Sequence, residues 1–263
     1  MNRRIAWNLF LVLMLALSTV CTGSVGWAQT LARMNVTTVG GGVPAAGGGT
    51  TYPDILFYDG FEGATNAAKP SDKARTLKSG AALDNGSTPT APVGSYSLDC
   101  PSEYDRAQYS VSSADIISGA EGRLGLYIYI ESVTGAPYIF DYSVDGSNII
   151  NAYLTTGRAV YFYYKAGGES MVITSSVTIT AETWTFVEIA WDNAGNSYKI
   201  YIDGTERGSA TDNLPDWAGT GGTLQIGETS GNSGNFHVDQ VIISNDATRD
   251  LNAIKSTTSF PSS

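Results

Sequence analysis

The stretch that most constrains this sequence is residues 184–204, WTFVEIAWDNAGNSYKIYIDG. Residues 184–191 are rich in Thr, Val, Ile, Phe and Trp, which favour β-strands. Residues 198–203 alternate from one side chain to the next in the way that a half-buried strand does. The connection, residues 192–196, holds Asp, Asn and Gly, which tolerate the backbone angles of tight turns. The stretch therefore predicts a β-hairpin inside a large antiparallel sandwich.

The rest of the chain has the same character. Residues 124–131 place Leu or Ile at even positions and Tyr127, Tyr129 and Glu131 on the other face, as expected of a strand with one side in the core. Short turns containing glycine separate the neighbouring runs, which indicates antiparallel meanders. The other predicted strands are residues 55–58, 96–100, 107–111, 138–144, 149–154, 160–165, 171–179, 224–227 and 236–244.

Composition agrees with an all-β globular protein. Hydrophobic residues make up 42% of the chain and charged residues 15%, which excludes an intrinsically disordered protein. Tyrosine and glycine are frequent, as strands and turns require. Apolar stripes with helical spacing are missing beyond the extreme N-terminus.

Residues 1–28 are predicted to be a signal peptide. A basic start at residues 2–4 precedes the apolar run of residues 9–17, and Gly26 and Ala28 place small side chains before a cut at Gln29. The apolar run is shorter than the roughly 20 residues that cross a membrane. We therefore expect a secreted, periplasmic or cell-surface protein with no membrane span after cleavage.

Two alternatives to a cleaved signal peptide stay open. The segment can be a retained anchor, or Cys21 can carry a lipid, although Val20 is bulky where a small residue is expected. Residues 29–53 include a run of glycines around Val43 and Pro44 and are predicted to be a flexible linker.

The chain is acidic. Its formal net charge is −10, and removal of residues 1–28 takes away two arginines and no acid, which leaves −12. Such a charge disfavours nucleic acid and anionic membranes as partners. Cys100 is then the only cysteine, so no internal disulfide supports the predicted domain.

Several short motifs together carry a family resemblance. In chain order they are residues 59–62 (DGFE), Trp184, residues 191–192 (WD), 201–204 (YIDG), 224–227 (LQIG) and 238–243 (VDQVII). The set resembles the laminin-G-like, concanavalin-A-like lectin/glucanase jelly-roll superfamily over residues 54–247. The resemblance implies two curved antiparallel sheets packed face to face, with residues 248–263 as a C-terminal tail.

No complete catalytic motif is present. Jelly-roll glycosidases carry Glu-x-Asp-x-x-Glu, but the best match, residues 103–108, has Gln108 where the acid/base would stand. Residues 164–167 (YKAG) are similar to an alginate lyase segment, but the other lyase strands are missing. His237 is the only histidine, which excludes multi-histidine zinc sites, and no Gly-x-Ser-x-Gly elbow accompanies it. We therefore expect a protein that is not an enzyme.

A calcium ion fits the acidic residues near the two ends of the predicted domain. Ca²⁺ prefers carboxylates mixed with backbone carbonyls. Asp59 and Glu62 lie in a Gly-flanked turn, and the resemblance implies a ligand at Asp239, paired with one from the opening strand. The prediction is a structural Ca²⁺ bound by Glu62 and Asp239, with Asp59 as a further ligand. Solvated turn acids are the alternative.

Tyrosines at alternate positions suggest a surface for sugars, which stack their C–H faces on aromatic rings. The candidates are Tyr127, Tyr129, Tyr161, Tyr163 and Tyr201. Alternation gives the face of each strand but not its sheet, and ordinary cross-strand packing is the alternative. We predict an exported, non-catalytic module that binds carbohydrate or another extracellular surface. The alternatives are an adhesive module without a small ligand and a glycoside hydrolase or polysaccharide lyase.

Overall fold

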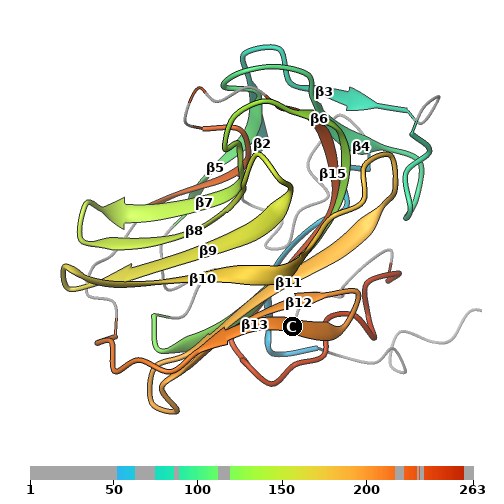
Figure 1. Cartoon of the computed structure of the whole chain (residues 1–263). Coiled ribbons are helices and arrows are strands. Elements are labelled where there is room, and N and C mark those ends of the chain that lie inside the picture. The colour runs from blue at the N-terminus through green and yellow to red at the C-terminus, as the bar shows by residue number, and fades with distance from the viewer. Residues whose placement is uncertain are drawn as a thin grey trace, which may run out of the picture. The chain divides into compact units, whose positions relative to one another are not determined.

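The computed structural model describes residues 52–62, 75–85, 89–111, 119–216, 222–229, 231 and 234–257 (Figure 1). The predicted signal peptide, and the predicted linker up to Thr51, lie outside the described residues. No helix in the described part is long and apolar enough to cross a membrane.

Two antiparallel sheets make up the fold, as predicted for a jelly-roll sandwich (Figure 1). In spatial order, sheet A contains β13 (Thr205–Ala210), β12 (Ser197–Ile202), β11 (Thr185–Asp192), β6 (Glu121–Val133), β15 (Gly234–Ser244), β4 (Ser97–Cys100) and β3 (Ala82–Asp84). Sheet B contains β10 (Glu169–Thr178), β9 (Ala159–Ala166), β8 (Asn148–Leu154), β7 (Tyr138–Asp145), β14 (Gly222–Gly227), β5 (Arg106–Val111) and β2 (Arg75–Lys78). β1 (Ile55–Asp59) pairs with the second half of β15.

The predicted hairpin is confirmed as β11 and β12. Asn196 and Gly204 have φ of 50° and 75°, the left-handed backbone that Asn and Gly adopt most easily. β11 also pairs with β6 along nearly its whole length, so the hairpin lies inside sheet A.

The core lies between the sheets and follows the alternation seen in the sequence. On β6 the even-numbered Leu and Ile side chains are buried, whereas Tyr127 and Tyr129 face outward and are half-buried. Trp191 on β11 is fully buried in the same core as Phe140 and Phe162 of sheet B. Each such apolar side chain contributes about 1.5–3 kcal/mol by burial.

Trp184, at the head of the predicted hairpin, lies outside the core between the sheets. It precedes β11, is partly exposed, and packs near Tyr129 with ring centroids 5.5 Å apart. Its indole Nε1 donates to the carbonyl oxygen of Thr90 at 2.8 Å. Of the two tryptophans of this hairpin, only Trp191 belongs to the core.

The predicted C-terminal tail is part of the folded domain as far as Thr257. Leu251 is fully buried and packs with Phe186 and Ile242 in a small second cluster on the outer side of sheet A. Gln240 Nε2 donates to the carbonyl oxygen of Thr257. Residues 248–257 of the predicted tail therefore help to cover apolar side chains on the outer face of sheet A.

Candidate functional site

A row of polar side chains crosses the outer face of sheet B. Gln225 on β14 pairs with Gln108 on β5 and with Asp141 on β7. Asp141 pairs with Asn151 on β8, which pairs with Tyr163 on β9. Directly paired residues lie side by side on one face. Because the flanking residues of these strands lie in the core, the amide row of Gln108, Gln225, Asp141 and Asn151 faces outward, with Tyr163 at its end.

Hydrogen bonds order the amide row but leave some of its atoms without partners. Gln225 Nε2 donates to Asp141 Oδ2 at 3.1 Å. Burial raises the pKa of Asp141, while hydrogen bonds from Gln225 and Asn151 and the charge of Arg106 oppose this shift. Asn151 Oδ1 and Arg106 Nε are buried without a hydrogen-bond partner. The row therefore combines donors and acceptors, the pattern that hydroxyl groups match because they do both.

A tyrosine ladder lies next to the amide row. Tyr138, Tyr153 and Tyr161 pair across β7, β8 and β9, with ring centroids 5.3 Å and 4.7 Å apart. All three are half-buried. Burial, and next the neighbouring Tyr161, raise the pKa of Tyr153 to about 12, so its hydroxyl stays protonated at neutral pH. Sheet B thus presents aromatic rings beside amide groups on one face.

The five predicted tyrosines do not form one platform. Tyr161 and Tyr163 lie on the outer face of sheet B, whereas Tyr127, Tyr129 and Tyr201 lie on the outer face of sheet A, across the core. The alternation on β6, β9 and β12 is similar although the strands belong to different sheets, so the sequence alone could not separate the two groups. Tyr138 and Tyr153 were missed, although Tyr153 alternates with Asn151 on a predicted strand.

The tyrosines of sheet A have structural partners. Lys255 Nζ lies 5.5 Å from the ring centroid of Tyr127, over a ring that also packs against Phe186. The Arg123 guanidinium lies 4.0 Å from the ring centroid of Tyr201. Tyr201 also lines a cavity of about 270 Å³ together with Arg123 and Lys199. Sheet A therefore uses these rings for packing, in part under the C-terminal segment.

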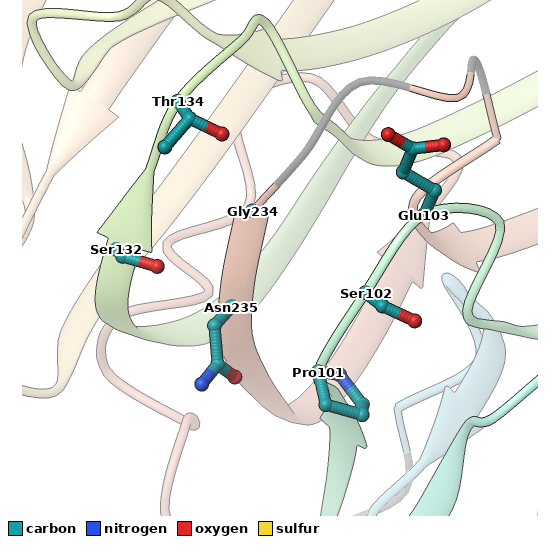
Figure 2. A pocket seen from close by; sticks show the side chains of 7 residues that line it. All are labelled: Pro101, Ser102, Glu103, Ser132, Thr134, Gly234 and Asn235. Atoms are coloured by element: carbon teal, nitrogen blue, oxygen red, sulfur yellow. The ribbon is translucent and has the colours of Figure 1, made fainter.

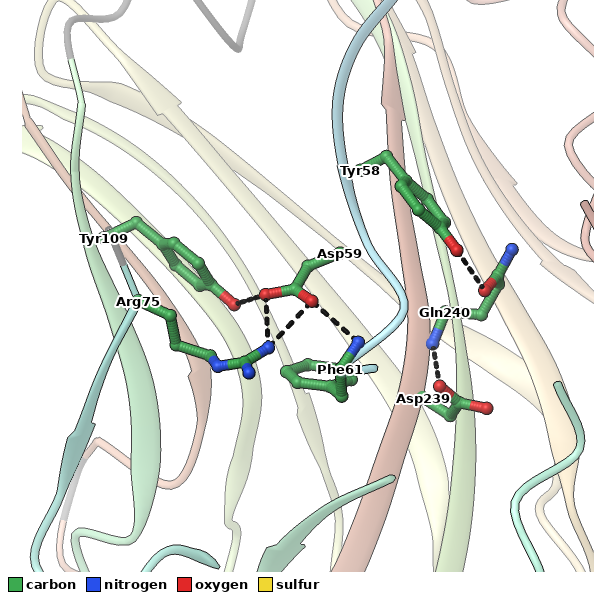
Figure 3. A network of polar contacts seen from close by, with 7 residues as sticks. All are labelled: Tyr58, Asp59, Phe61, Arg75, Tyr109, Asp239 and Gln240. Carbon is green, nitrogen blue, oxygen red and sulfur yellow. Dashed lines mark hydrogen bonds and ion pairs between the residues drawn. The ribbon is translucent and has the colours of Figure 1, made fainter. Parts of the chain in front are cut away.

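The three predicted metal ligands have different surroundings, and Figure 3 shows two of them, Asp59 and Asp239. Asp59 is buried and accepts hydrogen bonds from Arg75 Nη1 at 2.8 Å, from the Tyr109 hydroxyl and from the Phe61 amide. Asp239 accepts hydrogen bonds from the amide of Gln240 (Figure 3) at 2.7 Å and from another backbone amide. The Asp59 carboxylate is thus already neutralised by the buried guanidinium.

Backbone amides of one loop, residues 93–96, donate hydrogen bonds to both Glu62 and Asp239. The amide of Val93 donates to Asp239 Oδ2 at 3.2 Å, and the amides of Ser95 and Tyr96 donate to Glu62 Oε1 at 2.7 Å and 3.1 Å. Burial raises the pKa of Asp239 to about 8; hydrogen bonds from Gln240 and Val93 oppose the shift, and the charges of Glu62 and Asp59 add to it. A cation beside these two carboxylates would remove this repulsion.

The acidic residues of the glycosidase-like segment are not arranged as a catalytic pair. Asp105 is buried and accepts hydrogen bonds from the amides of Gly80 and Ser102 and from the Ser102 hydroxyl. Glu103 instead lines a cavity of about 500 Å³ between the 101–103 segment and the ends of β6 and β15 (Figure 2). The remaining lining residues are Pro101, Ser102, Ser132, Thr134, Gly234 and Asn235.

Comparison with known families gives one match. Residues 109–251, more than half of the chain, match the model of a family described as the concanavalin A-like lectin/glucanases superfamily. No curated protein matches the chain.

Solved structures share the fold. The binding domain of Paraclostridial mosquitocidal protein 1 matches with a TM-score of 0.60 at 14% identity, over 77% of this chain and 52% of that one. The receptor binding domain of botulinum neurotoxin C/D mosaic serotype matches with a TM-score of 0.60 at 13% identity, over 78% and 51%. This chain thus spans about half the length of these toxin domains.

This chain also matches a solved structure over almost the whole length of that structure. The matched structure is domain 4 of AbnA, a GH43 extracellular arabinanase from Geobacillus stearothermophilus, in complex with arabinotriose. Its TM-score is 0.58 at 14% identity, over 78% of this chain and 98% of that domain. At such low identity these likenesses show the fold alone.

Proposed function

We propose that this chain, which belongs to the concanavalin A-like lectin/glucanase superfamily, is an exported carbohydrate-binding module that binds glycans on the outer face of sheet B. The observation that carries the proposal is the tyrosine ladder beside the amide row. Rings that are spaced 5.3 Å and 4.7 Å apart offer a continuous aromatic strip to the C–H faces of a sugar chain.

The polar side chains of the same face supply orientation. Gln108 and Gln225 are half-buried and carry amides that donate and accept hydrogen bonds, so they can engage sugar hydroxyls. Asn151 is buried and helps to hold Asp141 in place. Asp141 is held among them by its hydrogen bond with Gln225. The sugar therefore lies along the ladder with its hydroxyl edge toward the amide row.

A neutral glycan is the best-matched class of ligand. The row itself holds mainly uncharged amides and tyrosine hydroxyls, and the chain has a formal charge of −10, which disfavours polyanionic sugars. The matched arabinanase domain, whose structure holds the neutral trisaccharide arabinotriose, supports this choice by its similar fold.

Affinity electrophoresis tests the proposal. Gels that contain one soluble neutral polysaccharide each retard a protein that binds it. We expect retardation of the wild type in at least one gel, loss of retardation for Tyr161→Ala on sheet B, and no loss for the matched control Tyr201→Ala on sheet A. Equal loss for both variants, or retardation only by polyanions, contradicts the assignment to this face.

The module is proposed to act without catalysis. The Asp105 carboxylate is buried and held by structural hydrogen bonds, and Gln108 stands where the acid/base of a glycosidase would be. Release of reducing ends or of unsaturated products from a retarding polysaccharide would instead favour a hydrolase or lyase. An adhesive module without a small ligand would show no retardation in any gel.

A structural Ca²⁺ is proposed at Glu62 and Asp239. The buried Asp239 carboxylate, whose ionised form the charge of Glu62 disfavours, supports it, whereas Asp59 fits poorly because Arg75 already neutralises it. The ion would supply two positive charges that tie the loop of Val93 to β15. Carboxylate oxygens are the ligands that Ca²⁺ prefers.

Export is proposed from the basic, apolar and small-residue order of residues 2–28. N-terminal sequencing of secreted material should begin at or close to Gln29. Intact Met1 on membrane-bound protein would indicate the retained anchor, and a diacylglycerol-modified Cys21 found by mass spectrometry would indicate the lipoprotein.

A further inference from the structure

The single histidine of the chain lies among carboxylates on the outer face of sheet A. His237 on β15 pairs directly with Asp99 on β4. Asp84 approaches the same ring from β3, and Glu131 approaches it from β6. Three carboxylates from three strands therefore surround one imidazole, whose side chain is only 5% exposed.

Glu131 determines which ring nitrogen of His237 carries a proton. His237 Nε2 lies 3.3 Å from Glu131 Oε1, and an ionised carboxylate only accepts hydrogen bonds. Nε2 is therefore the donor. Asn235 Nδ2 donates to the other oxygen of Glu131 and holds that carboxylate in place. Metal-binding histidines are oriented in the same way, through the nitrogen that does not touch the ion.

The other ring nitrogen, Nδ1, is buried and has no hydrogen-bond partner. It lies 3.7 Å from Asp99 Oδ1 and 4.0 Å from Asp84 Oδ2, beyond the reach of a hydrogen bond. With the proton on Nε2, a deprotonated Nδ1 would direct its lone pair toward these two carboxylates. Nδ1 and the two aspartates of β3 and β4 therefore face one another.

We propose that His237 Nδ1, Asp84 and Asp99 bind a divalent transition-metal ion, with Zn²⁺ as the best match. Bonds of about 2.0–2.2 Å to nitrogen and oxygen at a tetrahedral angle separate two ligand atoms by roughly 3.3–3.5 Å. Among the described residues, no group of three His, Cys, Asp or Glu side chains is arranged to hold a metal ion. The proposed site therefore forms only if Asp84 and Asp99 move toward Nδ1 by roughly half an ångström. This site is separate from the proposed glycan face.

The charge of the cluster favours a dication. Burial raises the pKa of Asp99; His237 opposes this shift, and the charges of Asp84 and Glu131 add to it. The carboxylates thus repel one another at close range, and a bound dication relieves that repulsion. The side chains of Asp84 and Asp99 are 19% and 28% exposed, which gives the ion a way in from solvent.

Titration of the secreted chain with Zn²⁺ tests the proposal, without a polyhistidine tag and with saturating Ca²⁺ present. Because the chain has one histidine, every imidazole signal in a ¹⁵N spectrum belongs to His237. We expect one ion per chain by calorimetry and a large shift of the Nδ1 signal. Unmoved imidazole signals would show instead that a doubly protonated ring holds the carboxylates without a metal.

Three variants locate the ion. His237→Gln should abolish binding, and Asp99→Asn should weaken it at least tenfold. The control Glu169→Gln removes an exposed carboxylate at the start of β10 and should bind like the wild type. Equal binding by Asp99→Asn and the wild type overturns the proposal. The Asp99→Asn titration and the wild-type spectra decide the question even where His237→Gln fails to fold.

Discussion

Gln225 Nε2 donates to Asp141 Oδ2 at 3.1 Å and joins β14 to β7 in the middle of the outer face of sheet B. The two residues are far apart in the sequence. Gln225 belongs to the 224–227 motif of the family resemblance, but neither residue was predicted to be a site residue. Their contact arises because β14 inserts between β7 and β5. The proposed glycan surface is thus a product of strand order.

Replacement of Asp141 by Asn should change how stability depends on pH. The raised pKa means that the folded protein keeps this proton to a higher pH than the unfolded chain does. The free energy of unfolding therefore falls as pH rises from the ordinary value of 3.8 through the raised pKa, and then levels off. Asp141→Asn lacks this titration, so its stability relative to the wild type should increase across that range.

Urea unfolding of both proteins at pH 4 and pH 8 measures this difference. The comparison between the two proteins cancels the titration of all other groups. A stability difference that is the same at both pH values would show that Asp141 titrates normally.

Trp191 and Trp184 should differ in their contribution to stability. Trp191→Ala removes a ring that is fully buried in the core and should cost about 3–5 kcal/mol. Trp184→Ala removes a partly exposed ring and its hydrogen bond to Thr90, and should cost roughly 1–3 kcal/mol. Urea unfolding measured by circular dichroism gives the loss of unfolding free energy for each variant. A larger loss for Trp184→Ala than for Trp191→Ala would mean that the hairpin is placed incorrectly.

Removal of calcium should lower the melting temperature of the wild type. A bound ion stabilises the folded state by about 2.7 kcal/mol when its concentration is a hundred times Kd. Asp239→Asn should abolish the calcium response, because it removes one of the two proposed ligands. Calorimetric melting with chelator and with millimolar Ca²⁺ measures both effects, and equal melting temperatures for the wild type would exclude the site.

Asp59→Asn is the matched control for calcium. It breaks the buried ion pair with Arg75 and should cost about 3–5 kcal/mol. If Asp59 is not a ligand, this loss is the same with chelator and with Ca²⁺. A calcium response that disappears in Asp59→Asn would restore Asp59 to the ligand set.

The strands themselves could be predicted from the sequence, because alternation and turn residues act locally. β6 and the β11–β12 hairpin are examples, with bulky apolar residues in the core and Asn or Gly at the turns. β2, β3 and β13 were missed, since these short strands lack a regular apolar alternation and depend on distant partners. No strand was accordingly predicted between residues 58 and 96, where β2 and β3 lie.

The candidate site was predicted only in part. Tyr161 and Tyr163 lie on the outer face of sheet B, on the side of β9 that alternation sets apart from the core, but their neighbours on the sheet depend on long-range pairing that no local pattern encodes. Asp59 was interpreted as a metal ligand from its turn, whereas its partner Arg75 comes from a strand that was not predicted. Glu62 and Asp239 stay a prediction.

Amide chemical shifts recorded during titration with a retarding oligosaccharide test the central claim most directly. The account predicts that the largest changes fall on β7, β8, β9 and β14, around Tyr153 and Asn151. Changes concentrated on β6, β11 and β12 of sheet A, or around the cavity lined by Ser102 and Asn235, would contradict a glycan site on the outer face of sheet B.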